Sequence, residues 1–320
     1  MNCRTIPALA LAVLFALAAS AQDKPKARNS GKSKGKDAKV ADAPLPEGVK
    51  EFTYKQTPQG GLKLFVHYPP DWKATDQRPA IVFFFGGGWK NGTPTQFLNQ
   101  ATYLASRGMV AARADYRVSS RHQITPEKCV EDAKSAARWL RAHAAEQGID
   151  PQRIVSSGGS AGGHLAACTG MTDAYEAKDE ELKISSRPNA MVLFNPALDL
   201  GALEVGEKWP EGAVRGKEIV PQIDPARFIR QGVVPTIIFF GTGDRMLDHA
   251  RSFADKSKAL GNRCEVFTAA GQPHGFFNRP PWQEVTLRET DVFLSSLGYL
   301  KGEPTLKIPG ESRAELKREK

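Results

Sequence analysis

A regular alternation of apolar β-type runs with helical patterns, between residues 52 and 300, constrains the fold of this chain more than any other feature. The run from Ala80 to Phe85 is continuous and apolar and ends at glycines, which is typical of a central strand buried on both faces. Further strands are predicted at residues 52–54, 62–68, 110–113, 154–156, 191–194, 236–240 and 265–267.

Helical patterns fill the segments between these strands. The longest begins at Pro126, where apolar residues recur at spacings of three and four, and it ends before Gly148. Other helices are predicted at residues 95–107, directly after Ser160, at 248–260 and at 282–297. This order predicts a mostly parallel sheet with helices on both faces, in one domain at residues 48–300. The longer, irregular segments 173–188 and 201–231 are expected to form a small lid over the carboxyl edge of the sheet.

Residues 1–21 have the pattern of a secretory signal peptide. Arg4 precedes an apolar run at residues 8–19, and Ala19-Ser20-Ala21 matches the small-x-small cleavage rule. The run is too short to cross a bilayer, which takes about 20 apolar residues. The sequence therefore predicts a secreted protein, periplasmic or extracellular, without a membrane span.

Both ends of the chain beyond this signal are charged and poor in apolar residues. The composition of residues 22–47 predicts a disordered basic linker, and that of residues 301–320 predicts a charged C-terminal tail. Much of the formal net charge of +9 lies on these two segments. A solvated tether is the favoured interpretation, and contact of the basic tails with acidic polymers is the alternative. No nucleic acid partner is predicted, because an exported chain without a binding motif rarely meets one.

The cysteines do not form a disulfide framework. Removal of the signal removes Cys3 and leaves Cys129, Cys168 and Cys264, an odd number in a long chain. One pair can form in an oxidising compartment, but the sequence does not select it. The spacing of Cys and His matches no metal site, so we predict no metal.

The pentapeptide Gly158-Gly159-Ser160-Ala161-Gly162 matches G-x-S-x-G. It follows a predicted strand and precedes a predicted helix, which is the context in which a serine stands on a strained turn above a sheet edge. The flanking glycines allow the strand and the helix to approach closely. A phosphate-binding turn is disfavoured because neither G-x-G-x-x-G nor a P-loop is present. Ser160 is therefore the candidate nucleophile.

A serine hydroxyl needs an adjacent base to act as a nucleophile at neutral pH. His274 follows the last central strand in a loop bounded by glycine and proline, Gly271 to Phe276, and is the candidate base. His164 is near Ser160 in sequence but lies on the first turn of the following helix. We expect it to pack or hydrogen-bond beside the turn.

The third member of such a set is an acid that orients the histidine. Asp244 follows the strand at residues 236–240, and the chain order serine, acid, histidine is then the one typical of a G-x-S-x-G fold. Asp248 is the main rival and is expected instead to cap the next helix. Asp199 is a weaker rival.

The glycines of Phe85-Gly86-Gly87-Gly88-Trp89 end another central strand. Their backbone N–H groups can point into a site and hold a developing oxyanion. The predicted oxyanion hole consists of the N–H groups of Gly87, Gly88 and Ala161.

Together these residues resemble the esterase and lipase families that carry H-G-G-G with G-x-S-A-G-G. The chain is most similar to an exported branch with a G-G-G-W loop and a G-G-S-A-G-G-H turn, which includes relatives of hormone-sensitive-lipase-like esterases and bacterial enzymes that deacylate plant polysaccharides. The resemblance covers residues 62–297. It implies an α/β-hydrolase fold, carboxylic-ester hydrolysis through an acyl-enzyme, and no cofactor.

One residue departs from this family pattern. Phe85 stands where the family usually has a histidine that orients the glycine loop, so the sequence does not predict the pose of this loop. Asp115-Tyr116-Arg117 resembles the usual Asp-Tyr-Arg of the family and is interpreted as structural.

The leading hypothesis is a serine esterase for small acyl esters, including O-acetyl or feruloyl groups on carbohydrates. A peptidase of the same fold and a catalytically silent binding module are the alternatives. The chain is too short for the propeller domain of the related peptidases, and an intact serine, acid and histidine set disfavours the binding module. Trp89 and Trp209 fit a pocket wall and a core position equally well.

Overall fold

The computed structural model describes residues 45–203, 216–308 and 314–320. The predicted signal peptide, nearly all of the predicted linker, and Trp209 lie outside these residues. No helix within the described ranges is long and apolar enough to cross a membrane.

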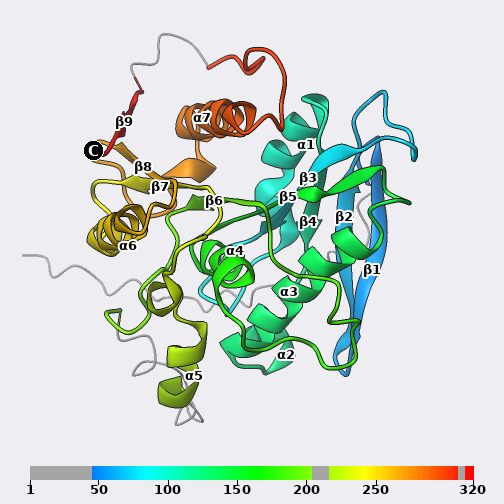
Figure 1. The fold of residues 1–320 in the computed structure, drawn as a ribbon, viewed down its shortest axis with the longest axis horizontal. Helices are drawn as coiled ribbons and strands as arrows, with labels where there is room; N and C mark the ends of the chain where they lie inside the picture. Colours follow the sequence, from blue (N-terminus) through cyan, green and yellow to red (C-terminus); the bar gives the residue numbers. More distant parts are fainter. Residues whose placement is uncertain (1–44, 204–215, 309–313) are drawn as a thin grey trace, which may run out of the picture. The chain divides into compact units, whose positions relative to one another are not determined.

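Among the described residues, one mixed sheet with the strand order β1-β2-β4-β3-β5-β6-β7-β8-β9 forms the centre of the molecule (Figure 1). Strands β3 to β8 run parallel to one another, while β2 and β9 run antiparallel to the strands beside them. The strands are β1 Val49–Thr57, β2 Gly60–His67, β3 Arg78–Phe84, β4 Val110–Ala114, β5 Ile149–Gly159, β6 Ala190–Phe194, β7 Thr236–Gly241, β8 Cys264–Ala269 and β9 Leu316–Arg318.

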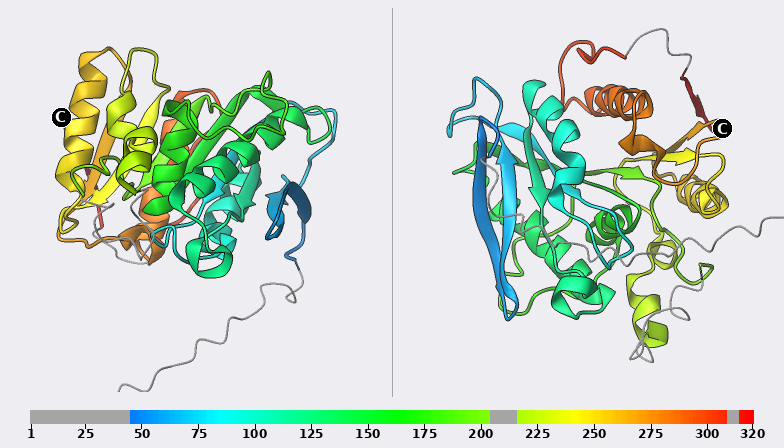
Figure 2. Two further views of the ribbon diagram at one scale, coloured as in Figure 1. Left: turned by 90° about the horizontal axis from the view of Figure 1, so that it is seen from below. Right: turned by 180° about the vertical axis from the view of Figure 1, so that it is seen from behind.

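Helices cover both faces of this sheet (Figures 1 and 2). One face packs against α1 and α7, and the other against α3, α4 and α6. The α-helices are α1 Leu98–Ser106, α2 Ser119–His122, α3 Pro126–Ala142, α4 Ala161–Met171, α5 Gly216–Ile223, α6 Leu247–Ala259 and α7 Trp282–Ser296, and the short 3₁₀ turns are η1 Pro94–Phe97, η4 Pro225–Phe228 and η5 Phe276–Asn278. The predicted α/β-hydrolase architecture is confirmed.

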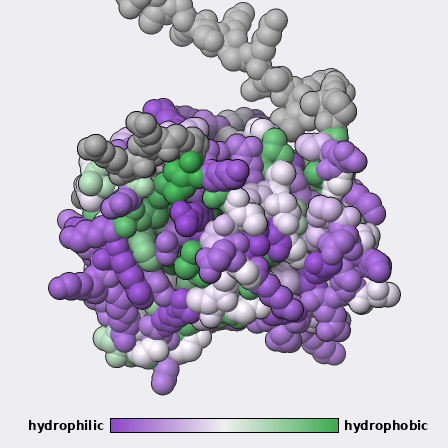
Figure 3. Space-filling view, turned by 90° about the horizontal axis from the view of Figure 1, so that it is seen from above, coloured by the Kyte–Doolittle hydropathy of each residue, from purple (hydrophilic) through white to green (hydrophobic). Residues whose placement is uncertain are grey.

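The central strand β3 explains why its sequence is apolar at every position. Ile81 and Phe83 belong to the core under α1 and α7, whereas Val82 and Phe84 belong to the core under α3, α4 and α6. Successive side chains of a strand point to opposite faces, so a strand covered on both faces needs apolar residues throughout. On the face drawn in Figure 3, hydrophilic residues dominate; the largest hydrophobic patch lies left of the centre, and smaller ones lie toward the upper right and at the lower left.

The predicted lid is wrong for residues 173–188. Lys134 Nζ of α3 donates hydrogen bonds to the carbonyl oxygens of Thr172 and Ala174, and Arg138 Nε donates to Ile184 O. These cations in the second half of α3 hold the segment along that helix, away from the carboxyl edge of the sheet. The described part of the second segment does flank the edge, since Leu203 lines the cavity there.

The prediction of a solvated C-terminal tail is also wrong for its last residues. The strand β9 pairs with β8 through Lys317 opposite Thr268 and Leu316 opposite Ala269. Glu319 adds an ion pair with Arg251 of α6 at 3.0 Å. A charged strand is well suited to a sheet edge, where one side faces water.

Candidate active site

Ser160 occupies a sharp turn between β5 and α4. Its backbone has φ 54° and ψ −118°, a conformation that is unfavourable for a residue with a side chain. Its amide N–H donates to Phe194 O of the neighbouring strand β6 at 2.8 Å, which holds the turn in place. The predicted strand–turn–helix context of Ser160 is therefore present.

The two flanking glycines of the motif permit close packing around this turn. A Cβ atom at Gly162 would lie 2.0 Å from Phe84 O, and one at Gly158 would lie 2.4 Å from the carbonyl carbon of Gly162. No side chain fits at either position, because real Cβ contacts are longer than about 3 Å. The motif thus allows α4 to start directly against β3 and β5.

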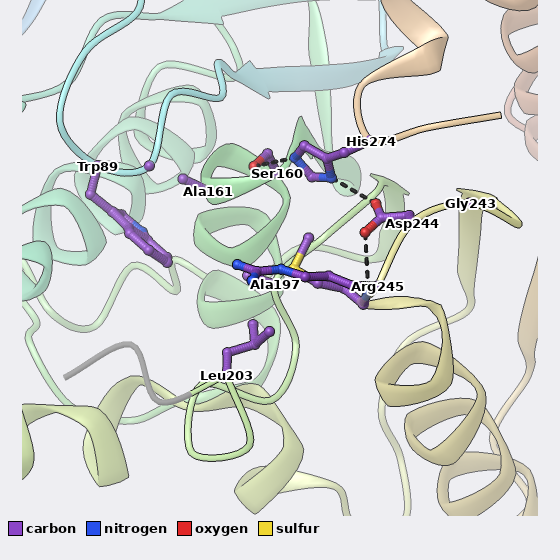
Figure 4. Close-up of a pocket in the computed structure, with 11 residues that line it drawn as sticks. Trp89, Ser160, Ala161, Ala197, Leu203, Gly243, Asp244, Arg245 and His274 are labelled. Carbon is purple, nitrogen blue, oxygen red and sulfur yellow. Dashed lines mark hydrogen bonds and ion pairs between the residues drawn. The ribbon is translucent and has the colours of Figure 1, made fainter. Parts of the chain in front are cut away.

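The three candidate catalytic side chains lie in hydrogen-bonding sequence (Figure 4). His274 Nε2 is 2.9 Å from Ser160 Oγ, and His274 Nδ1 is 2.6 Å from Asp244 Oδ2. The carboxylate fixes the proton of the imidazole on Nδ1, which leaves Nε2 free to accept the serine proton. The His274 side chain is 44% exposed and so faces the space where a substrate would bind.

Asp244 lies in the loop after β7, and its carboxylate accepts hydrogen bonds from other groups besides His274. Its Oδ2 also accepts a hydrogen bond from Asn195 Nδ2 at 2.7 Å, and its Oδ1 accepts one from the Met246 amide at 3.0 Å. Burial by itself raises the pKa of this carboxyl, but the hydrogen bonds from His274, Met246 and Asn195 outweigh it and lower the pKa below its ordinary value. The acid is therefore ionised at neutral pH.

Sequence reasoning did not select Asn195. It is fully buried and has φ 43°, in the left-handed region that asparagine tolerates better than most residues. The sequence does place an asparagine directly after a predicted strand, in Asn195-Pro196. It does not show that Asp244 is the partner of this asparagine.

Neither rival acid contacts the histidine. The Asp248 side chain is 85% exposed and pairs with Arg251 at 3.0 Å. It lies in the first turn of α6 but makes no capping hydrogen bond, so the predicted cap is wrong. Asp199 Oδ1 accepts a hydrogen bond from the Ala202 amide at 2.8 Å in its own turn.

The glycine loop after β3 presents backbone N–H groups near Ser160. Within the described ranges, the N–H groups of Gly87, Gly88 and Ala161 have no hydrogen-bond acceptor, whereas the Gly86 N–H donates to Gln96 Oε1 at 2.6 Å. Gly88 and Ala161 line the same cavity as Ser160. These are free donors of the kind that an oxyanion hole requires.

Aromatic contacts fix the loop where the family histidine is missing. The Phe85 ring stacks on Tyr116 at 4.0 Å between centroids, and Tyr116 Oη donates to Phe85 O at 2.6 Å. On the other side of the loop, Trp89 Nε1 donates to His164 Nδ1 at 3.1 Å. Asp115-Tyr116-Arg117 is thus structural, as predicted, and the loop has a defined pose.

His164 lies inside the protein, beside the nucleophile turn. Its Nε2 donates to Ile223 O at 2.6 Å, while its Nδ1 accepts from Trp89. Burial lowers the pKa of His164 to about 4, so the ring is neutral at neutral pH. The expected packing and hydrogen-bonding role of this histidine matches the structure.

A cavity of about 450 Å³ opens beside Ser160. It is lined by Gly88, Trp89, Ser160, Ala161, Ala197, Leu203, Gly243, Asp244, Arg245, Met246 and His274. Trp89 is buried and is also part of the wall of this cavity.

The three cysteines do not line this cavity. Cys129, Cys168 and Cys264 are buried free thiols, and burial raises the pKa of each.

A family model described as BD-FAE matches residues 66–258 of the chain. Among solved structures, Thermogutta terrifontis esterase 2 phosphoramylated by tabun is 46% identical, with a TM-score of 0.75, over 81% of this chain and 98% of that one. The same esterase with propionate bound is 46% identical, with a TM-score of 0.74 and the same coverage.

Relatives of lower sequence identity are also named as esterases. A probable isoprenylcysteine alpha-carbonyl methylesterase, ICMEL1, of Arabidopsis thaliana is 28% identical over 70% of this chain. The match spans only 50% of that relative's length. Carboxylesterase NlhH of Mycobacterium tuberculosis is 25% identical over 73% of this chain and 77% of its own length.

Proposed function

The chain belongs to the BD-FAE family, within the α/β-hydrolase esterases and lipases, and from that membership we propose that it is an exported serine carboxylic-ester hydrolase that removes small acyl groups from carbohydrates. The observation that carries the proposal is the hydrogen-bonded series Ser160, His274 and Asp244 beside free backbone donors. The relatives named above are all esterases by name.

The first half of the reaction forms an acyl-enzyme. Ser160 Oγ attacks the carbonyl carbon of the ester while His274 Nε2 takes its proton. The negative charge that develops on the carbonyl oxygen is held by the N–H groups of Gly87, Gly88 and Ala161. When the intermediate collapses, His274 returns the proton to the leaving alcohol.

The second half releases the acid. Water takes the place of the alcohol, gives its proton to His274 Nε2 and attacks the acyl carbon. Collapse of the second intermediate returns the proton to Ser160 Oγ and frees the carboxylic acid. Throughout, the Asp244 carboxylate stabilises the imidazolium, and its lowered pKa keeps it ionised while the histidine is charged.

Short acyl groups are the proposed substrates because of the size of the cavity and the likeness to a relative. The cavity of about 450 Å³ is at the lower end of the usual range for ligand pockets. Esterase 2 of Thermogutta terrifontis is described with propionate and with butyrate bound. The Trp89 indole in the wall offers a flat apolar surface to an acyl chain or a sugar ring.

Hydrolysis of acetyl, butyryl and feruloyl esters, and of acetylated polysaccharide, tests the proposal. We expect turnover of the short esters by the native protein and its loss in Ser160→Ala. A fluorophosphonate probe should label native protein and not the variant. Turnover of peptides alone would favour a peptidase, and an unlabelled protein without turnover would favour a binding module; either result refutes the esterase.

Two aspartate variants test the assignment of the acid. Asp244→Asn should lower kcat by about 10³ to 10⁴, because the histidine loses the group that sets its tautomer. Asp248→Asn is the matched control and should keep native kcat, since its side chain faces solvent and contacts Arg251. Equal effects of the two substitutions would contradict the assignment.

Export is part of the proposal. Mass spectrometry of protein recovered outside the cytoplasm should find a mature chain that starts at Gln22, after cleavage at Ala21. An intact Met1 in that fraction would contradict it.

A further inference from the structure

Arg245 carries a charge into the cavity beside the nucleophile. It directly follows Asp244 on the loop after β7, its side chain is exposed, and it lines the same cavity as Ser160. Figure 4 shows this side chain extending, in that view, between Trp89 and the loop that carries Asp244. The position places a cation next to any substrate held at Ser160.

No described residue of the chain pairs with the Arg245 guanidinium. Within the ranges that the structure describes, it makes no hydrogen bond and no ion pair, although most other arginines of the domain do; Arg117, for example, pairs with Asp132 at 2.7 Å. The adjacent Asp244 carboxylate is already occupied by His274, Asn195 and the Met246 amide. None of the five N–H donors of Arg245 is therefore used by a described residue.

The rest of the cavity does not compete for such a ligand. Among the described residues that line it, the other side chains are apolar, apart from the Ser160, His274 and Asp244 set. A guanidinium matches the two oxygens of a carboxylate in geometry, and the pair is stronger beside apolar walls than in open water.

From these observations we infer that Arg245 binds a carboxylate on the alcohol portion of the ester, which makes acylated acidic sugars the preferred substrate class. This inference rests on the proposed esterase function. The carboxylate is assigned to the alcohol portion because the acyl chains bound in the Thermogutta terrifontis esterase, propionate and butyrate, have uncharged tails.

Two matched esters test the inference: acetylated glucuronic acid and acetylated glucose. The first has a carboxylate where the second has a hydroxymethyl group. The readout is the ratio of kcat/KM for the acidic ester to that for the neutral one. In native protein the ratio should exceed one and decrease as salt is added, because an exposed ion pair is screened. In Arg245→Gln the ratio should fall about tenfold, mainly through KM, which is equivalent to about 1.4 kcal/mol.

Two further variants separate charge from disturbance of the loop. Arg245→Lys retains the charge and should keep part of the preference, though less than arginine because lysine lacks the two-pronged geometry. Arg288→Gln removes an exposed charge on α7, outside the cavity, and should leave the ratio as in native protein. Equal rates of fluorophosphonate labelling in native protein and Arg245→Gln would show that the Ser160 set is intact.

Three results would overturn the inference. A native ratio near one, or an equal loss on both esters in Arg245→Gln, would mean that Arg245 does not recognise the carboxylate. A preference that appears only between a monosuccinate ester and a butyrate ester would place the carboxylate on the acyl side. If neither sugar ester turns over and Ser160 is not labelled, the proposed esterase function fails as well.

Discussion

At the scale of single residues, the orientation of the Asp244 carboxylate depends on Asn195, a residue outside the catalytic set. Asn195 gives its amide hydrogen to the same Asp244 oxygen that accepts from His274, so it fixes the direction in which the carboxylate faces. Asn195 also has a φ of 43°, in the left-handed region of the backbone. A strained backbone at a site of this kind is retained where it positions a reacting group.

Asn195→Gly should lower kcat about tenfold with little change in KM, because a hydrogen bond to a charged group contributes about 1.5–3 kcal/mol. Glycine tolerates the positive φ, so the variant removes the donor without adding backbone strain. Steady-state kinetics on a short acetyl ester measure both constants, and thermal unfolding provides the control for folding. A variant with native kcat would show that Asn195 is not needed to position Asp244.

At the level of elements, the last strand joins the end of the chain to the sheet. The strand β9 extends the edge beside β8, and Glu319 reaches both Arg251 of α6 at 3.0 Å and Thr268 Oγ1 at 3.0 Å. These contacts connect a segment that is mostly charged to β8, the strand that precedes the His274 loop.

Deletion of residues 314–320 should lower the free energy of unfolding by about 1–2 kcal/mol, since a few ladder hydrogen bonds and a partly exposed ion pair are lost. Urea unfolding measures the change. Glu319→Gln retains the strand and should cost less than about 1 kcal/mol. An unchanged unfolding midpoint in the truncated chain would contradict a stabilising role for β9.

For the whole molecule, two buried neutral histidines make stability depend on pH. Burial, with the nearby charge of Arg113, lowers the pKa of His67 to about 4, and burial lowers that of His164 to about 4. Both rings accept a hydrogen bond at one nitrogen, from Arg113 Nε and from Trp89 Nε1 respectively. A protonated ring would lose that bond and carry a buried charge.

The sign of the pH effect follows from these pKa values. The unfolded chain binds protons on both histidines below their ordinary pKa of 6.5, whereas the folded chain binds them only near 4. The free energy of unfolding is therefore highest above pH 6.5 and falls as the pH drops from 6.5 towards 4, by roughly 1.4 kcal/mol per pH unit for each histidine.

Urea unfolding between pH 7 and 5 measures this slope, in a range where ordinary carboxyl groups scarcely titrate. His67→Gln should reduce the slope by about half, because glutamine accepts a hydrogen bond but does not titrate. A stability that stays flat between pH 6.5 and 5 would contradict the burial of two neutral rings.

The sequence by itself determined the order of elements and the chemical type of the site. Periodicity identified the strands and helices, since a strand buried on both faces must be apolar throughout and a helix must repeat its apolar face. The same local rules identified Ser160, Asp244 and His274 as candidates, because each lies in the turn or loop that follows a strand and parallel strands end at one sheet edge.

Only the tertiary structure decided which groups meet across long stretches of chain. The bond from Asn195 to Asp244, the contact of Tyr116 with the Phe85 carbonyl, and the place of Arg245 in the cavity wall have no local signal, because each depends on the distance between segments far apart in sequence. The pairing of β9 with β8 also has no local signal, because the charged residues of β9 alone predict a solvated tail. Nor does the sequence show that residues 173–188 are bound along α3. Local patterns specify elements, whereas packing specifies the neighbours that tune the chemistry.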